Sequence, residues 1–258
     1  MKLLAITVLV LLSPLAHAES SVDAVLNQVY GSYNKKDQCW ITKNNENAPY
    51  CMTLDHTAKV NNETGTSYRL YILVTGKCID DNECGRHVNT GLVGAFVAFI
   101  DEEDDGKTDM VYSNARIELG SNGIAPTGWQ FVKLSTNDWG WYNSDNFMQM
   151  GFTVGSYAIL APYNNSIRNL IPEGFIQNYD DTGTSCGSED KETCTAIESK
   201  LEFDSSQTDD ATEFFPIRLT VTGEDKGKVL GATVYTIPFD SKTWTYPMPK
   251  NWILKDKI

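Results

Sequence analysis

An uncharged apolar run followed at once by a run of acids sets the tightest limit on how this chain folds. Residues 92–100 carry no charge, and a run of this kind and length is typical of a strand buried on both faces. Five consecutive acids, 101–105, follow it, and a half-apolar run at 110–119 comes after Gly106. The pattern predicts two strands joined as a hairpin, with the acids in the connection.

The same acidic connection predicts a metal site. Carboxylate oxygens at alternate positions, one backbone carbonyl and a glycine at the bend are typical of calcium ligands. The candidate ligands are Asp101, Glu103, Asp105, Lys107 through its carbonyl, and Asp109. Over nine residues the segment resembles the Asp-x-Asp-x-Asp-Gly-x-x-Asp calcium turns between strands of extracellular β proteins, with glutamate at the middle position. An EF-hand is excluded because Tyr112 stands where a bidentate glutamate belongs, and a bare acidic turn is the alternative.

Further short runs along the chain also predict strands. They are rich in β-branched and aromatic residues or alternate in polarity, and they lie at residues 67–75, 149–153, 157–160, 174–179, 195–203, 215–222 and 229–237. We expect the second and third runs to form a hairpin that turns at Gly155, and the last two to form a hairpin across 223–227. Residues 34–66 are polar and rich in turn formers, which predicts loops.

One segment has helical periodicity. Its apolar residues recur at helical spacing and form one stripe: Val22, Val25, Leu26, Val29, Tyr30 and Tyr33. This predicts an amphipathic helix over 21–33, with the stripe packed on the core. The fold class expected is therefore mainly β, an antiparallel β-sandwich or barrel-like domain with one N-terminal helix.

The N-terminus has the pattern of a secretory signal peptide. Lys2 precedes an apolar run at 3–12, and Ala16-His17-Ala18 is a small-x-small cleavage site, which predicts a signal peptide at 1–18. We expect a main β-rich domain at 19–203, and a hairpin and tail at 204–258 packed on that same domain. The expected location is the periplasm or the extracellular space, with no transmembrane segment.

The cysteines indicate an oxidised, disulfide-stapled protein. An even number, six, follows the predicted signal peptide, as expected for an exported chain. Short spacings favour three local pairs, although six cysteines allow other connectivities. The favoured pairs are Cys39 with Cys51, Cys78 with Cys84, and Cys186 with Cys194.

The charge balance limits the partners. The chain has 21 Lys and Arg against 34 Asp and Glu, a formal net charge of −13. Nucleic acids and anionic lipid surfaces need basic residues, so neither is expected as a partner. An excess of acids fits good solubility, cation binding or a basic protein partner.

An aromatic segment at 128–152 contains the candidate ligand-binding residues Trp139, Trp141 and Tyr142. Trp139 and Trp141 flank Gly140 and point to one face if the segment is a strand. Aromatic rings framed by amides and carboxylates suit sugar stacking, whereas the alternative is ordinary core packing. Exposure of both tryptophans would mark a site.

No catalytic set emerges from the sequence. Residues 183–187 match Gly-x-Ser-x-Gly, but no histidine follows His87 to act as the base, so we reject a nucleophile elbow. We interpret His56, which follows Asp55, as a surface histidine on a loop. The leading hypothesis is a secreted or periplasmic, calcium-stabilised binding protein that recognises a glycan or protein partner of the cell envelope. The alternatives are a secreted inhibitor or immunity-type protein that blocks a basic enzyme, and a carboxylate-dependent hydrolase.

Overall fold

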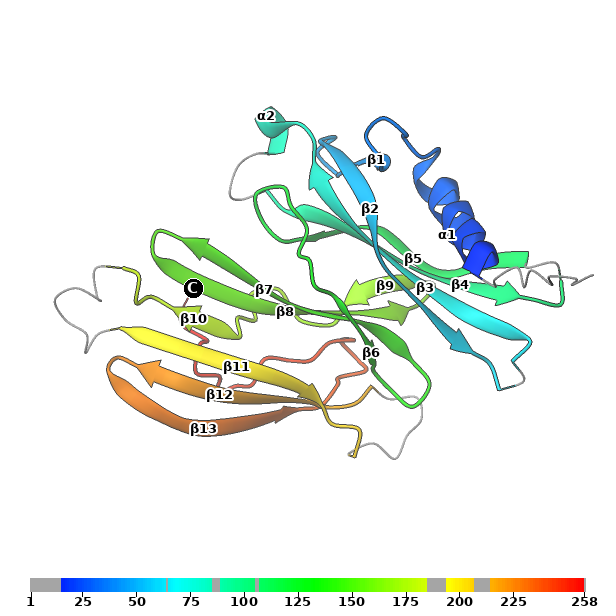
Figure 1. Ribbon diagram of the computed structural model, residues 1–258. Helices are drawn as coiled ribbons and strands as arrows, with labels where there is room; N and C mark the ends of the chain where they lie inside the picture. Colours follow the sequence, from blue (N-terminus) through cyan, green and yellow to red (C-terminus); the bar gives the residue numbers. More distant parts are fainter. Residues whose placement is uncertain are drawn as a thin grey trace, which may run out of the picture.

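The protein is a β protein built on one extended sheet (Figure 1). The computed structural model describes residues 15–63, 65–84, 89–104, 107–184, 194–206 and 214–257. The strands in these ranges are β1 (Trp40–Lys43), β2 (Pro49–Asn61), β3 (Ser67–Cys78), β4 (Gly91–Asp101), β5 (Lys107–Leu119), β6 (Gln130–Lys133), β7 (Trp139–Gln149), β8 (Phe152–Tyr163), β9 (Ser166–Asn169), β10 (Asn178–Asp180), β11 (Thr195–Phe203), β12 (Ile217–Asp225) and β13 (Lys228–Ile237). The helices described are α1 (Leu15–Tyr30) and the single turn α2 (Asp81–Cys84).

The sheet has 13 strands and branches at β8. Its main path runs β1-β2-β3-β4-β5-β9-β8-β10-β11-β12-β13, and the pair β6-β7 joins β8 beside that path. All the pairings are antiparallel except the single bridge between β5 and β9, where Ser113 pairs with Ser166. Figure 1 shows the two halves of the sheet, β1 to β5 and β10 to β13, lying apart with β8 between them.

Two side chains bridge the place where β8 changes neighbours. One edge of β8 pairs first with β10 and then with β9, which leaves backbone groups between these two pairings. The Tyr157 N–H donates to Gln177 Oε1 at 2.8 Å, and the Ile159 N–H donates to Asn169 Oδ1 at 3.1 Å. These bonds satisfy buried donors that would otherwise cost free energy, so β8 continues through the branch.

The predicted hairpin at Gly155 is wrong, because β8 is a single strand that passes straight through this residue. The chain turns earlier, at Met150 and Gly151, which both have positive φ. Gly155 is needed for close packing instead. A Cβ built on it would lie 2.2 Å from Asn146 Oδ1 and 2.9 Å from Asn178 Cβ, so only glycine fits between the neighbouring strands.

Three apolar clusters cover the faces of the sheet. The first packs Val22, Val25 and Leu26 of α1 on the outer face of β1 to β4. The second joins the opposite face of β3 and β4 to β6, β7 and β8. The third packs the C-terminal tail, including Tyr246 and Trp252, on β8 and β11 to β13. Layers on both faces confirm the predicted mainly β, sandwich-like class with an N-terminal helix.

Most strands with apolar patterns lie where the sequence predicts them, but the strand predicted at 174–179 is wrong except at its end, where β10 begins at Asn178. The runs at 67–75, 92–100, 110–119, 195–203 and 229–237 all fall in strands, and β4 and β5 form the predicted hairpin. The loop prediction for 34–66 is wrong, because β2 occupies much of it. Its residues after Met52 are mostly exposed or half-buried, so the sequence of this strand has no hydrophobic pattern that predicts it. Backbone pairing with β3 stabilises the strand instead.

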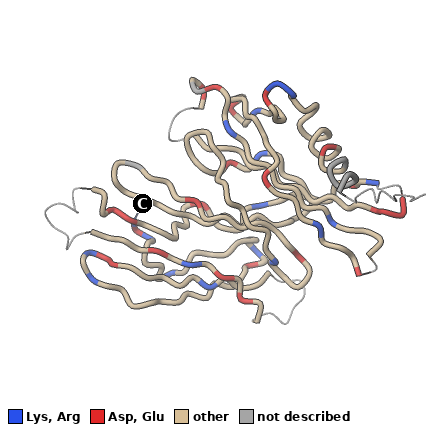
Figure 2. The backbone as a smooth tube through the Cα atoms, in the orientation of Figure 1, with Lys and Arg blue, Asp and Glu red and all other residues tan. Residues whose placement is uncertain are grey.

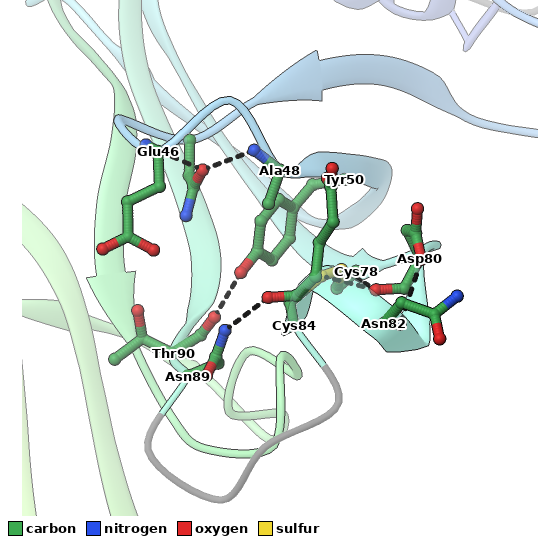
Figure 3. Close-up of a disulfide and its surroundings, with 11 residues drawn as sticks. Glu46, Ala48, Tyr50, Cys78, Asp80, Asn82, Cys84, Asn89 and Thr90 are labelled. Carbon is green, nitrogen blue, oxygen red and sulfur yellow. Dashed lines mark hydrogen bonds between the residues drawn. A yellow bond between two sulfur atoms is a disulfide. The ribbon is translucent and has the colours of Figure 1, made fainter.

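Two of the predicted disulfides are present. Cys39–Cys51 ties the segment before β1 to β2, and Cys78–Cys84 ties the end of β3 to α2 (Figure 3). Cys186 lies outside the described residues, so the third pair stays a prediction. No helix in the described ranges has the length and hydropathy of a membrane span.

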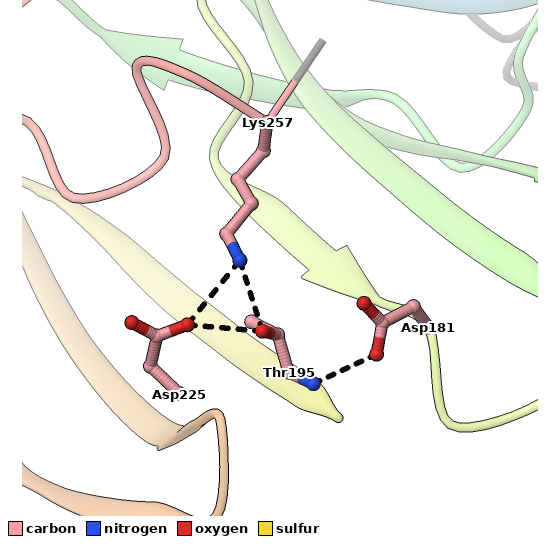
Figure 4. A network of polar contacts seen from close by, with 4 residues as sticks. All are labelled: Asp181, Thr195, Asp225 and Lys257. Carbon is pink, nitrogen blue, oxygen red and sulfur yellow. Dashed lines mark hydrogen bonds and ion pairs between the residues drawn. The ribbon is translucent and has the colours of Figure 1, made fainter. Parts of the chain in front are cut away.

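A polar network fastens the C-terminal tail to the sheet (Figure 4). The Lys257 ammonium donates to Asp225 Oδ1 at 3.2 Å and to Thr195 Oγ1 at 2.9 Å, and the Thr195 N–H donates to Asp181 at 2.7 Å. Partial burial acts to raise the pKa of Asp225, but the hydrogen bonds from Thr195 and Lys257 outweigh it and hold this pKa below its usual value. The tail is therefore held by charge as well as by packing.

Candidate functional site

The acidic connection lies between β4 and β5. In Figure 2 the acids at the end of β4 are coloured red. Asp101 ends β4, and its Oδ1 accepts the Glu103 N–H at 3.0 Å. Lys107 and Asp109 lie on β5, where the Lys107 ammonium is 3.6 Å from Asp109 Oδ2 and both side chains are exposed. Asp105 lies outside the described residues. Within the described ranges, no three acidic, histidine or cysteine side chains converge as a metal site.

The calcium ion therefore stays a prediction with a direct test. We expect the melting temperature to be higher in calcium than in EDTA, because an ion held only by the folded turn stabilises it. At about 100 times its Kd the ion would add about 2.7 kcal/mol to the free energy of unfolding. The variant Asp101→Ala/Asp105→Ala should lose this difference, whereas Asp23→Asn on α1 should keep it. Equal melting in calcium and EDTA contradicts the prediction.

The tryptophan pair does not form an exposed platform. Trp139 and Trp141 point to one face of β7, as predicted, but that face is in the core. Trp141 is 0% exposed, and Trp139 is half-buried and stacked on Phe131 with ring centroids 5.1 Å apart. Exposure of both tryptophans, the condition for a site, is not met, because the faces of β3 and β4 cover them and Phe131 of β6 packs beside them. Ligand binding by this pair stays a prediction.

Tyr142 points to the opposite face of β7 and packs in another apolar cluster. Its ring centroid is 5.5 Å from that of Tyr157 and 6.1 Å from that of Phe203. Burial, followed by the neighbouring Tyr157, raises the pKa of Tyr142 well above its usual value. Tyr142 is therefore packed between strands and does not share a surface with the tryptophans.

Asp55 and His56 lie at an irregular point in β2, where the register with β3 shifts between Leu54 and His56. Partial burial raises the pKa of Asp55, although His56 and the Thr75 hydroxyl both act to lower it. The Thr75 hydroxyl donates to Asp55 Oδ2 at 3.4 Å. His56 itself is exposed, in agreement with a surface histidine.

A cleft of about 650 Å³ lies near the branch of the sheet, between the ends of β4 and β5 on one side and the first half of β8 with residues 169–176 on the other. Four segments distant in sequence line it: Thr90 before β4, the end of β5 at Glu118 and Leu119, the first half of β8, and residues 169–176. Leu119, Val154, Ile171, Pro172, Phe175 and Ile176 supply apolar wall. A hollow of this size, with apolar walls and a few polar groups, has the features of a ligand site.

The polar groups of the cleft are acidic or neutral. Glu118 and Glu173 are exposed carboxylates in its lining, beside Thr90, Ser156 and Asn169. Among the described lining residues there is no Lys, Arg or His. The cleft therefore presents negative charge next to an apolar wall, which disfavours anionic ligands.

The rim at Glu118 is shared with the turn between β1 and β2. The Asn45 amide donates to Glu118 Oε1 at 3.4 Å. Burial raises the pKa of Tyr50, and Glu118 and Glu46 add to this shift, so both carboxylates act on the same phenol. The Tyr50 hydroxyl donates to the Thr90 carbonyl at 2.6 Å, as Figure 3 shows, and so supports the strand end that lines the cleft.

Sequence reasoning missed this cleft. Glu118 and Glu173 are 55 positions apart and neither belongs to a motif. Their meeting depends on the branch at β8, which no local pattern encodes. The excess of acids, which predicts a basic partner, was the one sequence signal that indicated an acidic binding surface.

Comparison of the chain with protein-family models, with curated proteins and with solved structures finds no match.

Proposed function

We propose that the protein binds a basic, partly apolar segment of a partner protein in the cleft between the β4–β5 end and β8. One observation carries the proposal: the cleft combines an apolar wall with Glu118 and Glu173 and has no basic residue among its described lining. A lysine or arginine side chain fits such a lining, because its stem packs on apolar surface while its charge meets a carboxylate. The net charge of −13 also draws basic partners toward the protein.

A protein partner explains the cleft better than a glycan does. Sugar recognition uses exposed ring faces, and the two aromatic side chains that line the cleft, Tyr157 and Phe175, are both buried. Tyr157 is further fixed by its hydroxyl, which donates to the Ser199 carbonyl. An inhibitor that blocks a basic enzyme is one form of this proposal, and a location outside the cytoplasm is part of it.

A carboxylate-dependent hydrolase is the second candidate, because two glutamates line the same cleft. Hydrolysis needs one carboxyl group to give a proton while the other acts as a base or nucleophile. Turnover of a glycan, abolished by either Glu118→Gln or Glu173→Gln alone, would favour this candidate over binding.

Binding is tested with a labelled peptide of alternating lysine and leucine, measured by fluorescence anisotropy. We expect the chain to bind it and to reject the same peptide with glutamate in place of lysine. Glu118→Gln/Glu173→Gln should weaken binding about tenfold, since each partly exposed ion pair contributes about 0.5–1 kcal/mol. The affinity should also fall as salt is added.

The matched control is Asp23→Asn/Glu63→Gln, which changes the net charge equally at exposed positions outside the cleft. It should keep the affinity of the unmodified chain. Equal weakening by both double variants would assign the effect to overall charge and contradict the proposed site.

A further inference from the structure

Strand β13 leaves one backbone edge of the large sheet open. It is the last strand on the main path of the sheet and has 10 residues. Its backbone pairs with β12 on one side, and among the described residues no backbone bond reaches its other side. Figure 1 shows β13 at the outer margin of the molecule. Such an edge is a template for pairing with another strand.

The sheet has other open edges, but they are shorter or protected. Beyond β1, residues 53–61 of β2 carry Asp55, His56, Lys59 and a register shift, and beyond β6, residues 143–149 of β7 carry Asp145. β1 and β6 have 4 residues each. β1 is also close to α1 and to the Cys39–Cys51 disulfide, so little of its edge is open. The open edge of β13 is thus long enough for a stable ladder, whereas these two are not.

The second half of β13 lacks the features that protect edge strands. Charged residues, prolines and bulges are the usual protection. Lys228 and a register shift at Gly231 and Ala232 occur in the first half, but residues 233–237 carry no charge, no proline and no register shift. Val229 is 84% exposed and Val234 is 48% exposed. In a chain with a net charge of −13, this edge is where a like-charged molecule can approach without direct repulsion.

We propose that β13 pairs with β13 of a second copy of this chain, antiparallel and centred on Val234. One charge at the start of the strand and one three residues past its end at Ile237 favour this occupant. Lys228 is six positions before Val234 and Asp240 is six positions after it. Antiparallel pairing therefore brings Lys228 of each copy toward Asp240 of the other, twice by symmetry.

Asp240 is held as an anion by its own turn, which makes it available to that lysine. Its carboxylate accepts the Lys242 N–H at 2.9 Å and the Thr243 hydroxyl at 3.0 Å. These bonds, led by that of the Lys242 N–H, keep the pKa of Asp240 below its usual value. On the core side, the Tyr235 hydroxyl contacts the Asn251 carbonyl, so the tail keeps β13 in place while its edge pairs.

Sedimentation velocity over a range of protein concentrations tests the proposal. We expect the unmodified chain to show a monomer–dimer equilibrium. Val234→Lys should raise the dimer dissociation constant more than tenfold, because it places two ammonium groups against each other at the symmetry axis. Lys228→Glu should also weaken the dimer, and added salt should reduce that effect.

Thr222→Lys is the control, since it adds the same charge to an exposed position on β12, away from the open edge. It should dimerise like the unmodified chain, and all the variants should keep its circular dichroism spectrum. A monomer at every concentration, or a Val234→Lys variant that dimerises normally, overturns the proposal. If the protein is a monomer, the open edge of β13 is available to pair with an extended segment of a different protein.

Discussion

Raising the pH from about 9 to about 12 should unfold the protein in a steep transition, because buried tyrosines resist ionisation. Burial raises the pKa of Tyr30, Tyr142 and Tyr246 well above the usual value near 10. A raised pKa in the folded state means that full stability is present below about pH 10 and is lost as the pH rises toward the folded pKa. Each such tyrosine costs about 1.4 kcal/mol per pH unit in that window, so three cost about 4 kcal/mol per unit.

The measurement is denaturant unfolding at several alkaline pH values, together with tyrosinate absorbance. Tyr246→Phe is the matched variant, since it keeps the buried ring and removes the hydroxyl that donates to the Phe215 carbonyl at 2.8 Å. We expect this variant to be less stable at neutral pH but to lose stability less steeply above pH 10, by about 1.4 kcal/mol per unit. Tyrosinate absorbance that reaches its full value near pH 10 in a folded chain would contradict the prediction.

Trp141→Ala should destabilise the protein by about 3–5 kcal/mol, the usual cost of removing a large buried aromatic side chain. Trp141 is fully buried, and its ring centroid is 5.8 Å from that of Tyr71 and 6.2 Å from that of Phe131. Truncation leaves a cavity between β7 and the face of β3 and β4. Thermal and denaturant unfolding measure the loss, which for a surface ligand-binding tryptophan would be close to zero.

Two further variants separate core packing from other causes. Trp141→Phe should cost less than Trp141→Ala, because it keeps a ring and loses an indole N–H that has no hydrogen-bond partner among the described residues. Trp139→Ala should also cost less, because Trp139 is only half-buried. A Trp139→Ala variant that loses more stability than Trp141→Ala would contradict the placement of the core.

Several strands that the sequence predicts correctly have one buried face or two, whereas β13 is predicted from apolar residues that are mostly exposed. β4 is buried almost throughout, and β12 alternates buried with half-buried residues, so both leave a clear hydrophobic pattern. β2 leaves none, because its second half is held by backbone pairing with β3. The turn predicted at Gly155 is wrong for a related reason. Glycine is required here because Asn146 and Asn178 pack too close for a side chain, and this packing exists only in the folded sheet.

The candidate site was less accessible to sequence reasoning than the fold. Spacing rules work when the ligands come from one segment, as in the acidic turn after Asp101, but the cleft takes its lining from four. The alternation of Trp139 and Trp141 correctly gives their common face. Whether that face is covered depends on where β3 and β4 lie, and local periodicity does not contain this information.

Because the C-terminal tail packs on the sheet, the second half of the sheet folds only after the end of the chain has been synthesised. Trp252 and Leu254 belong to the same apolar cluster as β11 and β12, and Lys257 joins the polar network of Thr195 and Asp225. This half of the sheet cannot complete its core until residue 257 has left the ribosome. The half that contains α1 and β1 to β5 needs only β6 to β8 to cover its other face, and these strands are made well before the tail. A nascent chain would thus carry a finished first half beside an unfinished second one, whose bare strands are the part in need of a chaperone.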